Sequence, residues 1–347
     1  MDLSERLIFR RDGQNDADGM ALSRAAVRGT LVRLKRGAYL ESSVWAELPR
    51  HRRHLALVLA FARSHPGAVF SHQSAAVLHG LPLIGALPPT VQVLAQRATG
   101  GRSEPGLHRR CLGFEDHEVT ELQFSETWVR VTTVSRTLSD LAQVQPFAYA
   151  VAPLDFALRE HMTSAEELVE ALARRRPFRG AGRVERVLEF GDARAEFPGE
   201  SLSRARIHEL GFLAPDLQVR HRNPRGGHFR TDFEWVDIGQ IGEFDGKGKY
   251  LKDEYTGGRP AGEVVYDEKL REDALRAEDK GVSRWGWPEA FGGKALRALL
   301  LRAGIPIVRA PIASRGRSEQ ARLFEHPRLF GTTARARQPR ASRCQGG

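Results

Sequence analysis

The clearest pattern along the chain is an alternation of polar and apolar residues in its last third. Two runs, residues 228–236 and 240–247, alternate with a period of two and flank a turn at residues 237–239. Because alternate side chains of a strand point to opposite faces, this pattern predicts a β-hairpin from Arg230 to Lys247, in which Asp232 and Asp245 are expected to face each other to within about one strand spacing. Three further elements are expected nearby: a helix at about residues 200–210, a helix at about residues 268–278 and a strand that includes residues 282–284.

A second pattern lies near the start of the chain. Ser23 is expected to cap a short helix that ends at Gly29, a residue that readily adopts a left-handed conformation. Ala26 and Val27 are expected to face inward in this helix. Residues 31–39 then alternate and turn at Gly37, as the β-wing of a winged helix-turn-helix does.

This amino-terminal stretch is strongly basic and has no acidic residue between Gly19 and Leu40. Basic residues on a helix and wing mainly bind phosphates, which positions a protein on DNA without specifying a sequence. The alternative is a solvated basic face on a small structural subdomain. The residues expected to contact DNA here are Arg24, Arg28, Arg33, Lys35 and Arg36.

The middle of the chain contains a predicted helix within residues 70–83, with Ser71 as its N-cap and Gly80 just past its end. His72 and His79 are seven residues apart and can face one way. We interpret them as packed or capping histidines rather than as a site. Arg136 and Asp140, four residues apart on a second predicted helix, are expected to form a structural ion pair.

Composition narrows the class of protein. The chain has 347 residues with 53 Lys and Arg against 43 Asp and Glu, a net charge of +10 that favours an anionic partner such as nucleic acid or an acidic membrane surface. Cys111 and Cys344 are too far apart in sequence for a disulfide framework or a zinc pair, so a reducing cytoplasm is expected. No apolar run predicts a signal peptide or a membrane span.

Composition shifts divide the chain into five predicted segments. A basic Arg/Gly/Pro stretch follows the middle unit and is expected to stay outside any core, as a hinge or an arm that contacts the DNA backbone. The segments are a winged helix-turn-helix (1–45), a mixed α/β middle domain (50–173), a basic linker (174–185), a nuclease-like α/β domain (186–311) and a mostly disordered basic tail (312–347).

The strongest candidate chemistry lies on the second strand of the predicted hairpin. Glu243, Asp245 and Lys247 alternate with Phe244 and Gly246, so all three ionisable side chains face one way. If Asp232 lies level with them on the first strand, the carboxylates form a site for Mg²⁺ or Mn²⁺, and the lysine can orient the attacking water. The alternative is a salt-bridged face of an exposed edge strand that blocks aggregation.

These segments resemble two known families. Residues 22–39, 70–83 and 131–142 resemble the winged-helix module and middle domain of the AbiEi antitoxins of abortive-infection, type IV toxin–antitoxin systems. Residues 215–218, 230–235 and 242–250 resemble the very-short-patch-repair-endonuclease-like domain of the PD-(D/E)xK superfamily, which is fused to such amino termini in many bacterial proteins. The resemblance covers most of residues 20–311. It implies a restriction-endonuclease-like α/β/α fold for the carboxyl-terminal domain.

The nuclease resemblance implies a set of site residues. Asp232 matches the aspartate of the Pro-Asp motif, and Thr231 takes the place of the usual proline. Either Asp245 is the acid of an intact Asp245-Gly-Lys247 motif, or Glu243 is that acid and Lys247 reaches in from one pleat further. The remaining implied residues are Glu200, as a helix-borne acid, and Arg284, on the strand that follows the closing helix.

Two functions follow from these patterns. The first is a Mg²⁺-dependent endonuclease that cleaves DNA, in phage defence or DNA repair, with the basic amino-terminal module and linker holding the duplex. The second is a non-catalytic DNA-binding repressor or antitoxin of a type IV toxin–antitoxin system. Both predict double-stranded DNA as a partner and no membrane contact, and both leave room for a homodimer or a partner protein.

Overall fold

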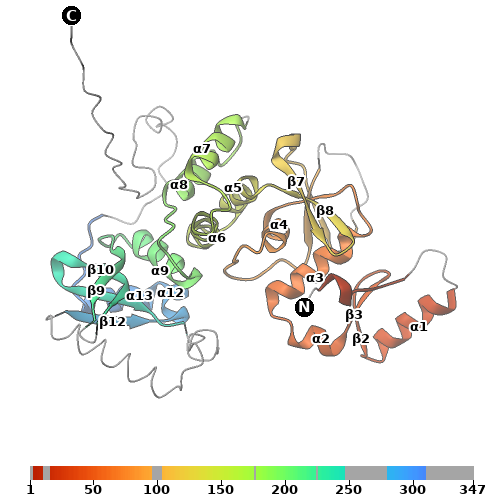
Figure 1. Cartoon of the computed structure of the whole chain (residues 1–347), viewed down its shortest axis with the longest axis horizontal. Helices are drawn as coiled ribbons and strands as arrows, with labels where there is room; N and C mark the ends of the chain where they lie inside the picture. Colours follow the sequence, from red (N-terminus) through yellow and green to blue (C-terminus); the bar gives the residue numbers. More distant parts are fainter. Residues whose placement is uncertain are drawn as a thin grey trace, which may run out of the picture.

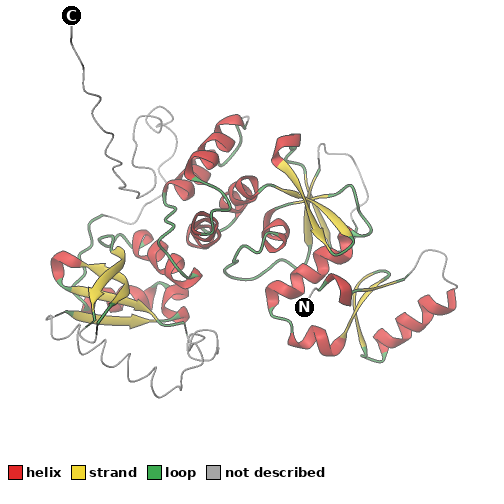
Figure 2. Cartoon of the chain, viewed as in Figure 1, coloured by secondary structure: helices red, strands yellow, loops and turns green. Residues whose placement is uncertain are grey.

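The computed structural model describes residues 3–10, 16–95, 104–175, 177–223, 226–246 and 280–309. These residues form an α/β structure in which helices combine with three sheets of three, four and five strands, so the predicted fold class is confirmed. Figure 2 shows the sheets separated by helices. In these residues no helix is both long and apolar enough to cross a membrane.

The amino-terminal unit is a helix followed by a hairpin. Its elements are η1 (Ser4–Arg6), β1 (Ile8–Phe9), α1 (Asp16–Val27), β2 (Leu31–Lys35) and β3 (Ala38–Glu41), with strand order β1-β3-β2. Gly29 and Gly37 have φ angles of 81° and 79°, which confirms the predicted helix end and hairpin turn. The predicted start at Ser23 is wrong because α1 begins at Asp16. Val27 is also 89% exposed rather than inward-facing, since a short apolar stretch does not fix the buried face of a longer helix.

The middle unit contains a five-stranded sheet with order β6-β5-β4-β8-β7. Its elements are α2 (Ser42–Glu47), α3 (Arg50–Ala62), β4 (Val69–Phe70), α4 (His72–Leu78), β5 (Val91–Leu94), β6 (Leu107–Arg110), η2 (Asp116–Glu118), β7 (Val119–Phe124) and β8 (Thr127–Thr132). Leu40 of β3 belongs to the same buried cluster as Leu59 of α3 and Val131 of β8. The amino-terminal hairpin and the middle sheet therefore share one hydrophobic core.

Four helices follow the sheet: α5 (Val134–Val144), α6 (Phe147–Arg159), α7 (Ala165–Arg174) and α8 (Ala181–Glu189). The prediction that residues 174–185 stay outside the core is wrong. Val184 of α8 is fully buried in the hydrophobic cluster that contains α5 and α6. The Gln143 amide also donates to the Arg179 carbonyl at 2.7 Å. The segment packs because Val184 is buried together with Val187 and Leu188 of the same helix.

The carboxyl-terminal unit places helices against a four-stranded sheet with order β12-β11-β10-β9, in which β11 and β12 are parallel. Its elements are α9 (Pro198–Glu209), β9 (Asp216–Arg222), β10 (His228–Trp235), η3 (Val236–Ile238), β11 (Gln240–Phe244), β12 (Gly281–Trp285), α12 (Trp287–Gly292) and α13 (Lys294–Arg302). The predicted hairpin, its preceding helix and its adjoining strand are confirmed. The helix expected at residues 268–278 and the tail at 312–347 lie outside the described residues.

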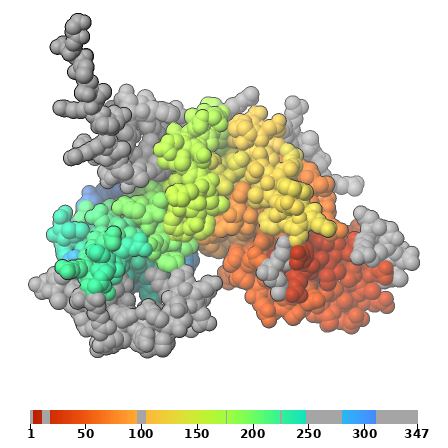
Figure 3. All heavy atoms as spheres, in the orientation of Figure 1, coloured from red at the N-terminus to blue at the C-terminus, as the bar shows by residue number. Residues whose placement is uncertain are grey.

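The units follow one another along the longest axis of the molecule (Figure 1). The α1 unit lies at one end, α5–α8 occupy the centre, and the β9–β12 sheet lies at the other end. One buried cluster extends from Leu141 of α5 through Leu202 of α9 to Phe233 of β10. The space-filling view shows the same order of segments on the surface (Figure 3).

Candidate functional site

The first candidate site is a line of ionisable residues across the carboxyl-terminal sheet. Phe233 of β10 lies opposite Gly242 of β11, so the same register sets Asp232 opposite Glu243. On the other side of β11, Glu243 is level with Arg284 of β12. Residues that lie level on neighbouring strands share a face. We call Asp232, Glu243 and Arg284 the sheet row.

The opposite face of these strands fixes the sheet on α9. Phe244 packs so closely on Gly199 that a Cβ at this glycine would lie 2.0 Å from the ring. Trp285 donates from Nε1 to the Ser203 hydroxyl at 2.8 Å. Because neighbouring residues of a strand point to opposite faces, these contacts direct the sheet row away from α9.

The sheet row combines two buried acids with an exposed cation. Asp232 and Glu243 are each 8% exposed, whereas Arg284 is exposed. One carboxylate oxygen of Asp232 accepts a hydrogen bond from the backbone N–H of Phe244 at 2.8 Å. This bond to a charged acceptor holds the Asp232 side chain in one orientation.

The register does not place Asp245 opposite Asp232, so that part of the predicted hairpin geometry is wrong. Asp245 lies two residues beyond Glu243, roughly 6.6 Å further along the strand direction. Its side chain is exposed, and its backbone N–H donates to the Trp285 carbonyl at 2.7 Å. Of the two candidate motif acids, Glu243 is the one level with Asp232. Lys247 lies outside the described residues.

Glu200 reaches the sheet through a different strand. It is 2% exposed in the first turn of α9 and accepts hydrogen bonds from the Glu196 backbone N–H at 2.9 Å and the Gln218 amide at 3.1 Å. Gln218 has a left-handed φ of 54°. The pairs that flank it on β9 set it level with Asp232. Glu200 is therefore tied to β9 at the level of the sheet row.

Two of the three residues of the sheet row carry groups that can bind a divalent cation. Mg²⁺ binds through hard oxygen ligands, commonly one or two carboxylates, and keeps several waters. Asp232 and Glu243 supply two such carboxylates. Across the residues that the structure describes, no three His, Cys, Asp or Glu side chains are grouped so that they could hold a metal ion. The predicted site of Asp232, Asp245 and Glu243 stays a prediction.

The basic amino-terminal residues differ in exposure. Arg24 and Arg28 of α1, with Arg33 and Arg36 of the hairpin, are exposed. Lys35 is not a free cation: its side chain is 9% exposed, pairs with Glu104 at 3.2 Å and lies 4.3 Å from the centre of the Phe61 ring. The prediction that Lys35 reaches DNA is therefore wrong in this structure. Its ammonium group lies over the Phe61 ring and so links the hairpin to α3 instead.

A buried charged cluster that the sequence did not reveal lies near the sheet row. Glu234 is 1% exposed, and its carboxylate contacts His221 Nε2 at 2.6 Å and Lys280 Nζ at 2.9 Å. Burial acts to raise the pKa of Glu234, but the bonds from Lys280 and His221 outweigh it and lower that pKa. The only signal in the sequence was an acid at an alternating position, and its partners are remote along the chain.

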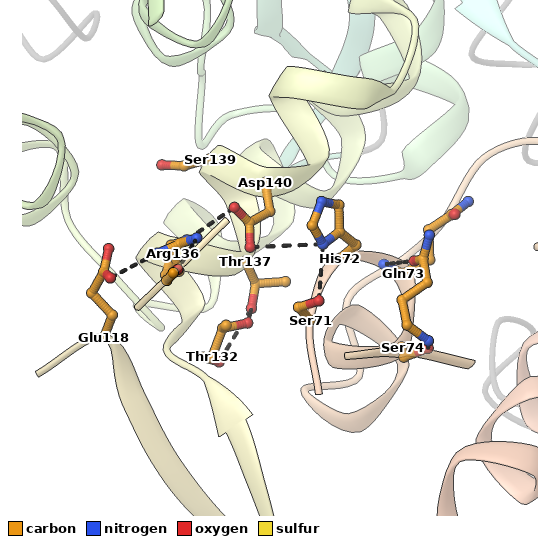
Figure 4. A network of polar contacts seen from close by, with 12 residues as sticks. Ser71, His72, Gln73, Ser74, Glu118, Thr132, Arg136, Thr137, Ser139 and Asp140 are labelled. Carbon is orange, nitrogen blue, oxygen red and sulfur yellow. Dashed lines mark hydrogen bonds and ion pairs between the residues drawn. The ribbon is translucent and has the colours of Figure 1, made fainter. Parts of the chain in front are cut away.

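A second polar network lies between the middle sheet and α5 (Figure 4). Arg136 donates to Asp140 at 2.9 Å and to Glu118 at 2.7 Å, and all three side chains are largely buried. His72 Nδ1 lies 3.0 Å from the Ser71 hydroxyl and 3.8 Å from Asp140. The predicted Arg136–Asp140 ion pair and the packed role of His72 are confirmed.

Ser71, His72 and Asp140 contain the side chains of a hydrolytic triad but not its geometry. A triad uses one imidazole nitrogen for the nucleophile and the other for the carboxylate. Here Nδ1 of His72 faces both neighbours, and each of the three residues is fully buried. His72 also holds a left-handed φ of 53°. The arrangement joins α4 to α5 and gives a substrate no access.

Buried histidines make stability depend on pH. Burial lowers the pKa of His72 to about 3, with nearby arginines adding to the effect, and burial lowers the pKa of His54 to about 4. The unfolded chain binds these protons from pH 6.5 downward, whereas the folded chain does not until about pH 3–4. Stability is thus complete above pH 6.5 and falls as the pH drops, by up to about 1.4 kcal/mol per pH unit for each histidine.

We expect His72→Asn to reduce this dependence between pH 7 and 5, because asparagine tolerates the left-handed backbone but does not titrate. Urea unfolding at both pH values measures the change. His117→Asn is the matched control, since His117 is exposed. Equal pH dependence in the His72 variant and the wild type would contradict the assignment.

Comparison with known proteins finds two relatives that share part of this sequence. No family model matches the chain. Two proteins of Mycobacterium tuberculosis, the uncharacterized protein MT2308 of strain CDC 1551 / Oshkosh and the uncharacterized protein Rv2248 of strain ATCC 25618 / H37Rv, are each 29% identical over 144 residues. The match covers 41% of this chain and 53% of each relative. The chain thus spans about half the length of the curated relatives it matches.

Proposed function

We propose that this protein is a Mg²⁺-dependent endonuclease of the PD-(D/E)xK type that cleaves double-stranded DNA. The observation that carries the proposal is the sheet row, in which the register sets Asp232 opposite Glu243 and level with Arg284. The AbiEi-like amino terminus and a reducing cytoplasm belong to the same proposal. A structural salt bridge on an edge strand accounts for the row less well, because β11 lies between β10 and β12.

Each residue of the site has a distinct role in this proposal. Asp232 and Glu243 would hold the ion, and Asp245 at the open end of β11 would complete its shell through water. The bound ion supplies charge that stabilises the phosphodiester transition state and promotes ionisation of the attacking water. Arg284 is exposed beside the acids and would bind a phosphate. Lys247 would orient the attacking water, and Glu200 would support the strand through Gln218.

Calorimetric titration of Mn²⁺ into the purified protein tests the metal site. We expect binding at millimolar or lower concentration in the wild type and its loss in Asp232→Asn, because the substitution removes one negative charge from the ion's ligands. Glu200→Gln is expected to weaken binding less, since Glu200 contacts Gln218. No heat of Mn²⁺ binding by the wild type at millimolar concentration would contradict the proposal.

The second candidate is a DNA-binding regulator without catalysis. The observation that favours it is the exposed side of α1, where Arg24, Val27 and Arg28 face solvent. On this proposal the triple variant Arg24→Ala/Arg28→Ala/Arg36→Ala binds all duplexes more weakly, because phosphate contacts carry no sequence information. Fluorescence anisotropy with unrelated duplexes at low salt measures the loss. If the triple variant binds DNA as tightly as the wild type, α1 and the following hairpin do not contact DNA.

A further inference from the structure

The β9–β10 hairpin presents an unusual group of basic side chains. Arg220 of β9 lies directly opposite Arg230 of β10, and Arg222 lies directly opposite His228. Directly opposite residues of antiparallel strands share a face, and residues two apart on one strand do as well. The four side chains therefore form a two-by-two group on one face, which we call the hairpin patch. All four residues are exposed.

The other face of the hairpin is packed, so the patch is the solvent side. His221, between the two patch arginines of β9, is buried and bonds to Glu234 at 2.6 Å. The Phe229 ring, between the patch residues of β10, stacks on His221 with ring centres 5.4 Å apart. These contacts fix the pleat of both strands and direct the hairpin patch outward.

The charge of the hairpin patch is only partly neutralised. Arg230 pairs with Glu196 at 2.5 Å. In the part of the chain that the structure describes, Arg220 and Arg222 make no ion pair with a carboxylate. Like charges placed directly opposite each other on a sheet are destabilising. An anionic ligand that spans the patch would offset this repulsion, because it places negative charge between the strands.

The charge of the patch and its place on the molecule indicate the kind of ligand. Arg230 precedes Asp232 by two residues on β10, but its pair with Glu196 directly before α9 turns it to the α9 side of the sheet, whereas the sheet row faces away from α9. The hairpin lies at one end of the long axis of the molecule and α1 at the other (Figure 1). A ligand that meets several of these cations at once must carry negative charges at regular spacing, as the phosphates of a DNA backbone do.

We infer that the hairpin patch is a second DNA-contacting surface, which binds backbone phosphates independently of the sheet row and of α1. This inference rests on the proposed DNA binding but not on catalysis. Two linked surfaces hold one duplex more tightly than either alone, because the second contact becomes intramolecular. The patch makes no demand on base sequence, since arginines on a strand face meet phosphates.

The inference is tested by measuring how tightly the full chain binds a labelled duplex in EDTA. Fluorescence anisotropy gives the affinity at each of several salt concentrations. EDTA prevents cleavage, so binding is measured separately from the proposed reaction. Arg220→Ala/Arg222→Ala should reduce the slope of log affinity against log salt by about 1.8, since each lost phosphate contact contributes about 0.9. The matched control is Arg297→Ala/Arg302→Ala, which removes two exposed arginines from α13 of the same unit.

The expected result is a lower slope for the hairpin variant only, with thermal unfolding of both variants like the wild type. A wild-type slope in the hairpin variant, or an equal reduction in the control, overturns the inference and leaves the patch to a different anionic partner. If the wild type binds no duplex at low salt, the inference and the proposed DNA binding both fail. If binding depends on the patch but Mg²⁺ produces no cleavage, only the nuclease proposal fails.

Discussion

Asp232→Asn is expected to lower the rate of DNA cleavage by at least about 100-fold, equivalent to roughly 2.7 kcal/mol of transition-state stabilisation. The carboxylate lies opposite Glu243 and is oriented by the Phe244 N–H at 2.8 Å. Asparagine keeps the shape of the side chain but removes the negative charge that a divalent cation requires. Cleavage of a labelled linear duplex at saturating protein and Mg²⁺ measures the rate.

The matched control for this variant lies in the same hairpin. Asp237 is exposed in the turn between β10 and β11, and Asp237→Asn makes the same change of charge away from the sheet row. We expect this variant to cleave like the wild type and Glu243→Gln to lose activity like the Asp232 variant. Cleavage at the wild-type rate by the Asp232 and Glu243 variants would show that the sheet row takes no part in cleavage.

Arg136→Ala is expected to lower the free energy of unfolding by about 3–5 kcal/mol, the usual cost of removing one partner of a buried ion pair. Its guanidinium bonds to both Asp140 and Glu118. Burial acts to lower the pKa of Arg136, but these two carboxylates outweigh it and raise that pKa, so the residue is charged. The substitution removes the arginine bonded to buried Asp140 and leaves Glu118 with the longer contact to Arg175 at 3.7 Å. Urea unfolding followed by circular dichroism measures the loss.

Arg174→Ala provides the comparison for the buried pair. Arg174 bonds to Glu170 four residues earlier on α7, but the two side chains are 56% and 62% exposed. Exposed pairs of this kind contribute about 0.3–0.5 kcal/mol. A loss of stability in Arg136→Ala no larger than that in Arg174→Ala would mean that the network does not join the sheet to α5.

The features that the sequence predicted correctly depend on local patterns. The hairpin of β10 and β11, the helix α9 and the strand β12 follow from alternation and helical spacing. Gly29 and Gly37 marked a helix end and a turn because both adopt positive φ angles. Arg136 and Asp140 were paired correctly because residues four apart on a helix are neighbours.

The errors depend on contacts between remote segments. The turn between β10 and β11 sets the register of the two strands. This register places Glu243 rather than Asp245 opposite Asp232. Lys35 has the pattern of a DNA contact, but Phe61 and Glu104, far along the chain, bury it. Residues 174–185 were read as a linker from their arginines and glycines, although Val184 packs into the core.

The proposed nuclease activity is tested most directly by incubating the purified wild-type protein with supercoiled plasmid in Mg²⁺, beside an identical reaction in EDTA. Gel electrophoresis separates the supercoiled, nicked and linear forms. We predict that Mg²⁺ produces nicked or linear DNA, that EDTA prevents it, and that Asp232→Asn prepared in the same way produces none. Plasmid that stays supercoiled in Mg²⁺ and in Mn²⁺ while the protein binds it would contradict the nuclease and favour the non-catalytic regulator.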